Sequence, residues 1–204
     1  TNGYGSINSP GNDPYVITVG AMKTMETASR ADDRITSYSS KGPTAIDHFV
    51  KPDLVAPGNR VIAVFQQNAR LADLYPQNVV SPSSYGSTSK QGSYFVLSGT
   101  SMAAPMVSGA AALLLQKDPT LTPDLVKARL MRTATKPSSF PLYSTSTDPL
   151  TGLTYTTRHD IFSMGAGYLD VWAALNDTSV ATAGKRALSP KAVRNSLTGV
   201  VSLS

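Results

Sequence analysis

An almost continuous apolar stretch over residues 102–115 is the feature that most constrains how this chain folds. It directly follows Gly99-Thr100-Ser101 and is interrupted only by Pro105, Ser108 and Gly109. A run of this length predicts a buried helix, which should end near Lys117 because Asp118-Pro119 follows. The run is shorter than the roughly 18 apolar residues of a membrane span, so no membrane partner is expected.

Ser101 stands at the expected start of this helix, and the position gives its hydroxyl a chemical use. The first backbone N–H groups of a helix have no partner within it, and the helix dipole adds positive partial charge there. Such an end stabilises the oxyanion that forms when a serine attacks a carbonyl, so Ser101 is a candidate nucleophile. Gly99 allows another chain to approach closely, and Pro105 is expected in the first turn, where it forfeits no N–H bond.

Short β-rich apolar segments alternate with helical patterns along the chain, and this alternation predicts an α/β layered fold. Strands are expected over residues 15–22, 53–56, 61–65 and 94–97. Helices are expected over residues 100–117, 122–134 and 170–175. Thr122 and Asp170 are the predicted N-caps of the last two helices. Residues 66–93 are expected to form an inserted surface loop or flap. Residues 136–160 are rich in Pro, Ser and Thr and are expected to form a second irregular surface segment.

Composition narrows the classes of partner and compartment. The formal net charge is +5, but the basic residues are dispersed, and Lys127, Arg129 and Arg132 are interpreted as the solvated face of a helix. No aromatic–basic motif accompanies them, so no nucleic-acid partner is expected. Asp32-Asp33 is expected to be an exposed acidic pair. The absence of cysteine excludes disulfides, and a charged fraction of 15% with many small polar residues favours a secreted protein.

Residues 98–109 read SGTSMAAPMVSG and resemble the nucleophile signature of the subtilisin-like (subtilase) serine peptidases. Four further segments resemble family blocks in the family's order: 9–21, 35–43, 51–58 and 165–175. The resemblance implies a three-layer α/β fold with a mostly parallel sheet, present here as its C-terminal portion. It assigns residues 1–176 to the peptidase domain and residues 177–204 to a linker or the start of a following region.

The same resemblance implies a serine endopeptidase that hydrolyses peptide bonds through an acyl-enzyme on Ser101. In this family the triad Asp and His lie in Asp-Ser/Thr-Gly and His-Gly-Thr-His-like blocks, and neither block occurs here. The oxyanion asparagine belongs to an Ala-Gly-Asn stretch, whereas Asn2 lacks that context and is expected to be a turn residue. We therefore expect the chain to begin just after the oxyanion donor and to be inactive alone.

Substrate residues and partners also follow from the resemblance. Asn8 and Ser9 align with the base of the primary specificity pocket, and together with Gly99 and Thr100 they are the expected substrate-binding residues. The expected partners are a polypeptide substrate and the N-terminal half of the domain. Unpaired strand edges also predict self-association of the isolated chain.

No cofactor is expected for catalysis, but the resemblance implies a weak structural site for Ca²⁺ or Na⁺. Its expected ligands are oxygens of Gly11, Asp13, Val16 and Asp53, which suit a hard cation. A second interpretation of Asp53 is a hydrogen-bonded structural aspartate without a metal.

Two other classes of function stay open. An α/β-hydrolase-type esterase would use Ser101, Asp148 and His159 in that chain order, although it leaves Pro105 and the upstream blocks unexplained. A non-catalytic subtilase-like binding module is the third class, which the sequence ahead of Thr1 would test. The two histidines, His48 and His159, lack the small neighbours of a catalytic histidine on a helix and are interpreted as solvated loop residues.

Overall fold

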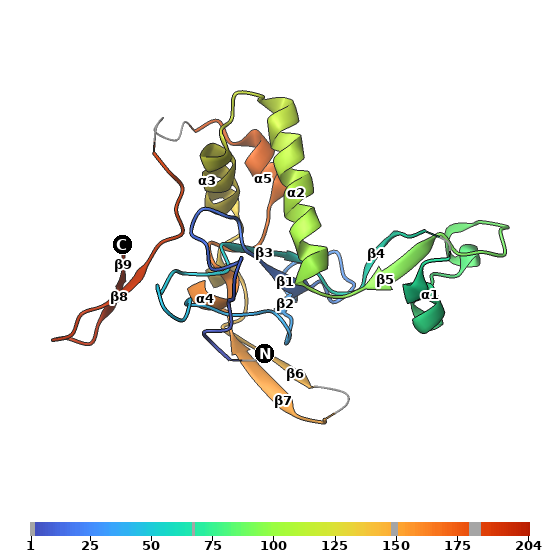
Figure 1. The fold of residues 1–204 in the computed structure, drawn as a ribbon, viewed down its shortest axis with the longest axis horizontal. Helices are drawn as coiled ribbons and strands as arrows, with labels where there is room; N and C mark the ends of the chain where they lie inside the picture. The colour runs from blue at the N-terminus through green and yellow to red at the C-terminus, as the bar shows by residue number, and fades with distance from the viewer. Residues whose placement is uncertain (1–2, 67, 148–150, 180–184) are drawn as a thin grey trace.

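A computed structural model describes residues 3–66, 68–147, 151–179 and 185–204 of the chain. At its centre lies a sheet with the strand order β2–β1–β3 (Figure 1). β1 (Val19–Lys23) runs parallel to β3 (Leu54–Pro57) and antiparallel to the short β2 (Arg34–Ile35). The other edge of β3 is also paired, because Val55 exchanges backbone hydrogen bonds with residues 167 and 169. Parallel pairing buried on both faces is typical of an α/β protein.

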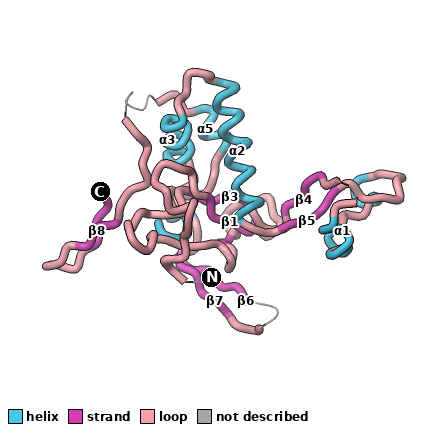
Figure 2. The backbone as a smooth tube through the Cα atoms, in the orientation of Figure 1, coloured by secondary structure: helices cyan, strands magenta, loops and turns pink. Residues whose placement is uncertain are grey.

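Three helices cover one face of this sheet: α2 (Thr100–Lys117), α3 (Pro123–Thr133) and α5 (Val171–Asn176) (Figures 1 and 2). Alternate strand residues point toward them and share a core with the inner side of α2. The members of this core from β1, β3 and α2 are Ala21, Leu54, Ala56, Ala103, Val107, Ala110 and Leu114. Alanines at the contact allow α2 to lie close to the strands, and each fully buried leucine contributes about 1.5–3 kcal/mol.

The opposite face of the sheet carries a second apolar core. Met22 and Val55, which alternate with the residues just named, pack there with Ile35, Phe140, Met164 and Tyr168. Met164 comes from the short helix α4 (Ile161–Met164). A sheet between two apolar layers confirms the predicted layered α/β architecture.

Sequence signals placed the main helices well. α3 starts after Thr122, whose hydroxyl accepts the N–H of Leu125 at 3.3 Å, and α5 starts after Asp170, whose carboxylate accepts the N–H of Ala173 at 2.8 Å. The placement of Pro105 in the first helical turn is wrong. It is the sixth residue of α2, so it cannot donate to the carbonyl of Ser101. No helix in the described part of the chain has the length and hydropathy needed to cross a membrane.

An arm extends away from the sheet beside the start of α2 (Figure 1). Its base is the antiparallel pair β4 (Val61–Val64) and β5 (Tyr94–Leu97). The chain segment that connects these strands is the predicted surface insertion. It contains the short helix α1 (Arg70–Leu74) and two 3₁₀ turns (Pro76–Asn78 and Pro82–Tyr85).

Two hairpins and a further 3₁₀ turn were not predicted. The first hairpin pairs β6 (Tyr143–Thr147) with β7 (Thr154–Arg158), and the second pairs β8 (Ala192–Arg194) with β9 (Val201–Leu203). The 3₁₀ turn spans Pro137–Ser139. The first hairpin is made largely of threonine and serine, so its strands carry no apolar alternation in the sequence. The assignment of residues 177–204 to a linker stays a prediction, but Pro190 in this segment accepts the N–H of Val50 at 2.8 Å.

The turn that leads into α2 rests on Gly58, the residue after β3. The carbonyl of Gly58 accepts the N–H of Gly99 at 2.8 Å and the hydroxyl of Tyr38 at 3.0 Å, while its own N–H donates to Met22 at 3.0 Å. A Cβ atom on Gly58 would lie 2.8 Å from both the Cβ of Ala21 and the carbonyl oxygen of Gly99. The backbone approach at this point therefore leaves room only for glycine.

A buried histidine lies on the face of the sheet away from α2. His159 is only 4% exposed, its Nε2 lies 3.0 Å from the hydroxyl of Ser144, and its ring packs edge-on against Phe140. The prediction of a solvated His159 is therefore wrong, because the β6–β7 hairpin encloses it, whereas His48 is exposed as predicted. Burial lowers the pKa of His159, since desolvation disfavours the imidazolium.

The close approach at Gly58 can be tested by substitution. We expect Gly58→Ala to destabilise the chain by about 1–3 kcal/mol, because backbone and core atoms must move apart. The matched control is Gly109→Ala in α2, where the added Cβ meets nothing within 4 Å. Helix propensity predicts a gain of about 0.5–1 kcal/mol there. Urea unfolding of the 204-residue chain measures both, and equal effects of the two substitutions would refute the packing argument.

The buried imidazole predicts a specific pH dependence. The folded pKa of His159 lies below the unfolded value of about 6.5, so the unfolded state takes up a proton first as pH falls. Stability should thus be intact above about pH 6.5 and decline below it. Urea midpoints between pH 8 and 5 measure the slope, which should flatten in His159→Phe. His48→Gln controls for the general loss of a histidine, and an unchanged slope in His159→Phe would contradict the assignment.

Candidate active site

Ser101 is the second residue of α2 and is exposed at the end of the helix that meets β5. Its backbone N–H has no acceptor, and its hydroxyl has no hydrogen-bond partner, among the residues that the structure describes. Both groups are therefore unengaged within the described residues, at the positive end of an 18-residue helix. This arrangement offers a nucleophile and one oxyanion donor from the same residue.

The two residues ahead of Ser101 are held by the contacts of Gly58. Gly99 is the N-cap position of α2, and its carbonyl accepts the N–H of Met102 at 3.0 Å. Partial burial raises the pKa of Tyr38, so its hydroxyl stays protonated and continues to donate to Gly58. Sequence reasoning missed Tyr38 as a support of this turn, because only the fold brings it beside Gly58.

The predicted pocket residues lie on an exposed turn. Asn8 and Ser9 are both exposed, and the turn closes through the N–H of Asn12 on the carbonyl of Asn8 at 3.2 Å. Gly99 and Thr100, the other predicted substrate residues, are partly exposed next to Ser101. No hydrogen bond in the described part of the chain connects Asn8 or Ser9 to the start of α2. Their role in binding substrate stays a prediction.

His159 is not placed to serve Ser101 as a base, and His48 is exposed on a loop. His159 packs through Phe140 on the second core, while Ser101 starts the helix that covers the first core, so the sheet lies between them. Asp148, the carboxylate of the alternative triad, lies outside the described residues. The arrangement needed for an α/β-hydrolase is therefore not formed around Ser101 and His159.

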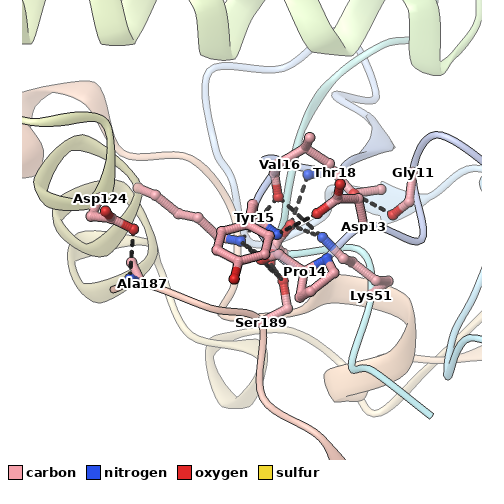
Figure 3. A network of polar contacts seen from close by, with 12 residues as sticks. Gly11, Asp13, Pro14, Tyr15, Val16, Thr18, Lys51, Asp124, Ala187 and Ser189 are labelled. Atoms are coloured by element: carbon pink, nitrogen blue, oxygen red, sulfur yellow. Dashed lines mark hydrogen bonds and ion pairs between the residues drawn. The ribbon is translucent and has the colours of Figure 1, made fainter. Parts of the chain in front are cut away.

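Two of the four predicted cation ligands meet, but around lysines (Figure 3). The carbonyl of Val16 accepts the ammonium groups of Lys51 at 3.1 Å and Lys127 at 3.0 Å. Asp53 lies 2.8 Å from the Nζ of Lys51 and 3.3 Å from the Nζ of Lys127. A metal ion at Asp53 would face two ammonium groups at close range, so these residues do not fit a bound cation. The alternative interpretation of Asp53 as a hydrogen-bonded structural residue is the one the geometry supports.

The other two predicted ligands are engaged elsewhere. The carbonyl of Gly11 accepts the hydroxyl of Thr18 at 2.6 Å, and the carboxylate of Asp13 accepts the N–H of Tyr15 at 2.7 Å (Figure 3). Among the described residues, no group of three or more His, Cys, Asp or Glu side chains could hold a metal. The expected cation site is thus not assembled from these four residues.

Two residues predicted to be solvated are buried. Lys127 is 2% exposed, because the side of α3 that carries it faces residues 14–16 rather than water. Asp33 is also 2% exposed, and desolvation raises its pKa. Both predictions of solvent exposure are wrong, since each rested on local charge and not on what the fold packs against it.

Comparisons with known proteins agree with the geometry. The sequence model of the subtilase family, Peptidase S8, matches residues 1–165. The chain is 45% identical over 125 residues to the serine protease AprX of Bacillus subtilis, an alignment that covers 61% of the chain and 26% of that protein. It is 30% identical over 165 residues to the subtilisin-like protease SBT4.10 of Arabidopsis thaliana, with 80% of the chain and 20% of that protein covered.

A solved structure supports the fold. The CspB protease of Clostridium perfringens superposes with a TM-score of 0.54 at 22% identity, covering 84% of this chain and 28% of that one. The chain therefore spans about a quarter, or less, of the length of these relatives. With the nucleophile turn, the layered fold and the family match in agreement, the chain belongs to the subtilase family of serine peptidases.

Proposed function

We propose that the protein containing this chain is a serine endopeptidase that cleaves polypeptides through an acyl-enzyme on Ser101. The observation that carries the proposal is the free hydroxyl and free N–H of Ser101 at the start of α2. Attack of Oγ on the scissile carbonyl passes its proton to a base and forms a tetrahedral oxyanion, to which the Ser101 N–H donates. The amine leaves with a proton from that base, and water then releases the acyl group.

The base is proposed to lie outside these 204 residues. The chain contains only two histidines, one exposed and one buried across the sheet from Ser101. A segment elsewhere in the protein would supply the histidine, the aspartate that orients it and the asparagine that completes the oxyanion hole. The small share of the relatives' length that aligns with this chain is consistent with such a segment.

The outer side of α2 supports an association with that segment. Met106, Leu113 and Leu115 are each about 40% exposed, and the helix is apolar almost all the way round. A helix with this composition is normally buried on every side. We propose that the N-terminal half of the domain covers this face, and that the isolated chain associates with itself when the face is left uncovered.

The proposal extends to substrate contacts and to compartment. Asn8, Ser9, Gly99 and Thr100 are proposed to contact the substrate backbone or side chains, and no cofactor is invoked for the reaction. Secretion is proposed from the low charged fraction of the chain. A non-catalytic binding module is disfavoured, because such a module would not need a freely accessible Ser101 at a helix start.

Labelling tests the nucleophile. In the full-length protein a fluorophosphonate should modify Ser101, because only an activated hydroxyl attacks the phosphorus rapidly. Ser101→Ala should abolish both labelling and peptide hydrolysis, whereas Ser108→Ala, on the same helix, should preserve both. Peptide mapping by mass spectrometry identifies the labelled residue. Modification of a different serine, with Ser101→Ala still active, would disprove the assignment.

Activity of the separated chain tests the origin of the base. Without a neighbouring base the Ser101 hydroxyl is a weak nucleophile at neutral pH, so the purified 204-residue chain should not hydrolyse casein above buffer. Refolding it together with the N-terminal half of the domain should restore hydrolysis. Robust hydrolysis by the chain alone, lost in His159→Ala, would instead favour the α/β-hydrolase alternative.

A further inference from the structure

A buried cluster of one carboxylate and two ammonium groups contacts the backbone of Pro14 and Val16, which Figure 3 shows with Lys51 and Ser189. Asp53, Lys51 and Lys127 are each no more than 2% exposed. One carboxylate oxygen of Asp53 accepts from Lys51 at 2.8 Å and from the N–H of Thr18 at 2.7 Å. The other accepts the hydroxyl of Ser189 at 2.5 Å and lies 3.3 Å from Lys127.

The Nζ atom of Lys127 sits inside a shell of oxygens. It lies 2.7 Å from the carbonyl oxygen of Pro14, 3.0 Å from that of Val16 and 3.0 Å from the hydroxyl of Ser189, besides the carboxylate of Asp53. Two carbonyls, a hydroxyl and a carboxylate around one positive centre are the donor types that hard cations take in proteins. Here a side chain of the protein itself provides the positive centre.

The charge balance of the cluster indicates what would replace this group. One carboxylate and two ammonium groups leave a net charge of +1 in a site without contact with bulk water. Removal of the Lys127 ammonium would take a cationic donor from four oxygens, which keep only their weaker share of contacts from Lys51, from the N–H of Ser189 and from the hydroxyl of Ser189. The remaining charges would be the neutral pair Asp53–Lys51. A monovalent cation would restore both the charge and the missing contacts.

We propose that the ammonium group of Lys127 is the internal cation of this site, so that the fold needs no bound metal there, and that its removal creates a monovalent-cation site. The ammonium group of Lys127 also binds the C-terminal segment to the core through the hydroxyl of Ser189, which lies beyond the residues that match the family. Ser189 donates its N–H to Pro14 at 3.0 Å, and Ala187 donates to the carboxylate of Asp124 on α3 at 2.8 Å. This proposal is independent of the proposed peptidase activity, since it concerns stability alone.

Thermal unfolding of the full-length protein tests the proposal, with the inactivating Ser101→Ala background preventing self-digestion. At one ionic strength, the parent should melt at the same temperature in sodium, potassium, methylammonium and choline chlorides. Lys127→Ala should melt about 10 °C lower in choline chloride, because a buried ion pair is broken. Sodium, potassium or methylammonium should recover part of this loss by mass action, whereas choline is too large to enter.

Two variants separate the cation site from general effects. Lys127→Met fills the space with an apolar side chain, so its melting temperature should fall without recovery by small cations. Lys136→Ala is the matched control, because the ammonium of Lys136 is likewise surrounded by oxygens, those of three backbone carbonyls, but it is exposed and not part of the cluster. Its melting temperature should depend on the four salts no more than that of the parent.

Crystals provide a readout that does not depend on the stability of the variant. Parent crystals grown in rubidium chloride should show no anomalous density between Asp53 and the carbonyls of Pro14 and Val16, and Lys127→Ala crystals should show it there. Rubidium at this place in the parent would overturn the proposal. A Lys127→Ala protein whose melting temperature is the same in choline, sodium and methylammonium chlorides would overturn it as well.

Discussion

The position of Ser101 depends on the contact between the backbones of Gly58 and Gly99. Gly58 directly follows strand β3 and is hydrogen-bonded to Met22 of β1, to Tyr38 and to the turn that opens α2. The buried sheet thus holds the turn before Ser101 through three hydrogen bonds at one residue. Since a Cβ atom at Gly58 would overlap both the core and the turn, the packing of the sheet and the position of Ser101 are set by the same close approach.

The second determinant of the fold is electrostatic. Asp53 directly precedes β3, and its carboxylate is contacted by Thr18 and Lys51, by Lys127 of α3 and by Ser189 of the C-terminal segment. A buried charge is costly unless it is paired and hydrogen-bonded, and every oxygen of this carboxylate is both. The cluster therefore joins elements that are remote in sequence at the start of the strand whose other end supports Ser101.

Local sequence signals were sufficient to predict where the helices lie, but not which ionisable side chains are buried. The apolar run, the proline positions and the capping residues Thr122 and Asp170 fixed α2, α3 and α5, because these signals act over a few residues. The β1 strand begins at Val19 and not at residue 15, since the preceding residues bond to the lysine cluster instead of a neighbouring strand. Lys127 and His159 were misjudged as solvated for the same reason, because partners distant in sequence bury them.

The candidate site shows the same division. Ser101 and the turn before it were predicted from one contiguous motif, whereas the support from Tyr38 required the folded chain. The cation ligands were predicted from a resemblance between sequence blocks, and a lysine on a distant helix changed the chemistry of that site. The family blocks predicted the course of the backbone at residues 11–16 and 53. The side chain of Lys127, which is distant in sequence, determines that an ammonium group and not a metal occupies this site.

The central claim is that this chain supplies a nucleophile whose base comes from elsewhere in the protein. A crystal structure of the full-length protein with Ser101 intact tests it most directly. The account predicts an imidazole nitrogen from outside these 204 residues within about 3 Å of the Oγ of Ser101, and His159 still bonded to Ser144 across the sheet. His159 at that distance from Ser101, or an open α2 start with no imidazole near it, would contradict the account.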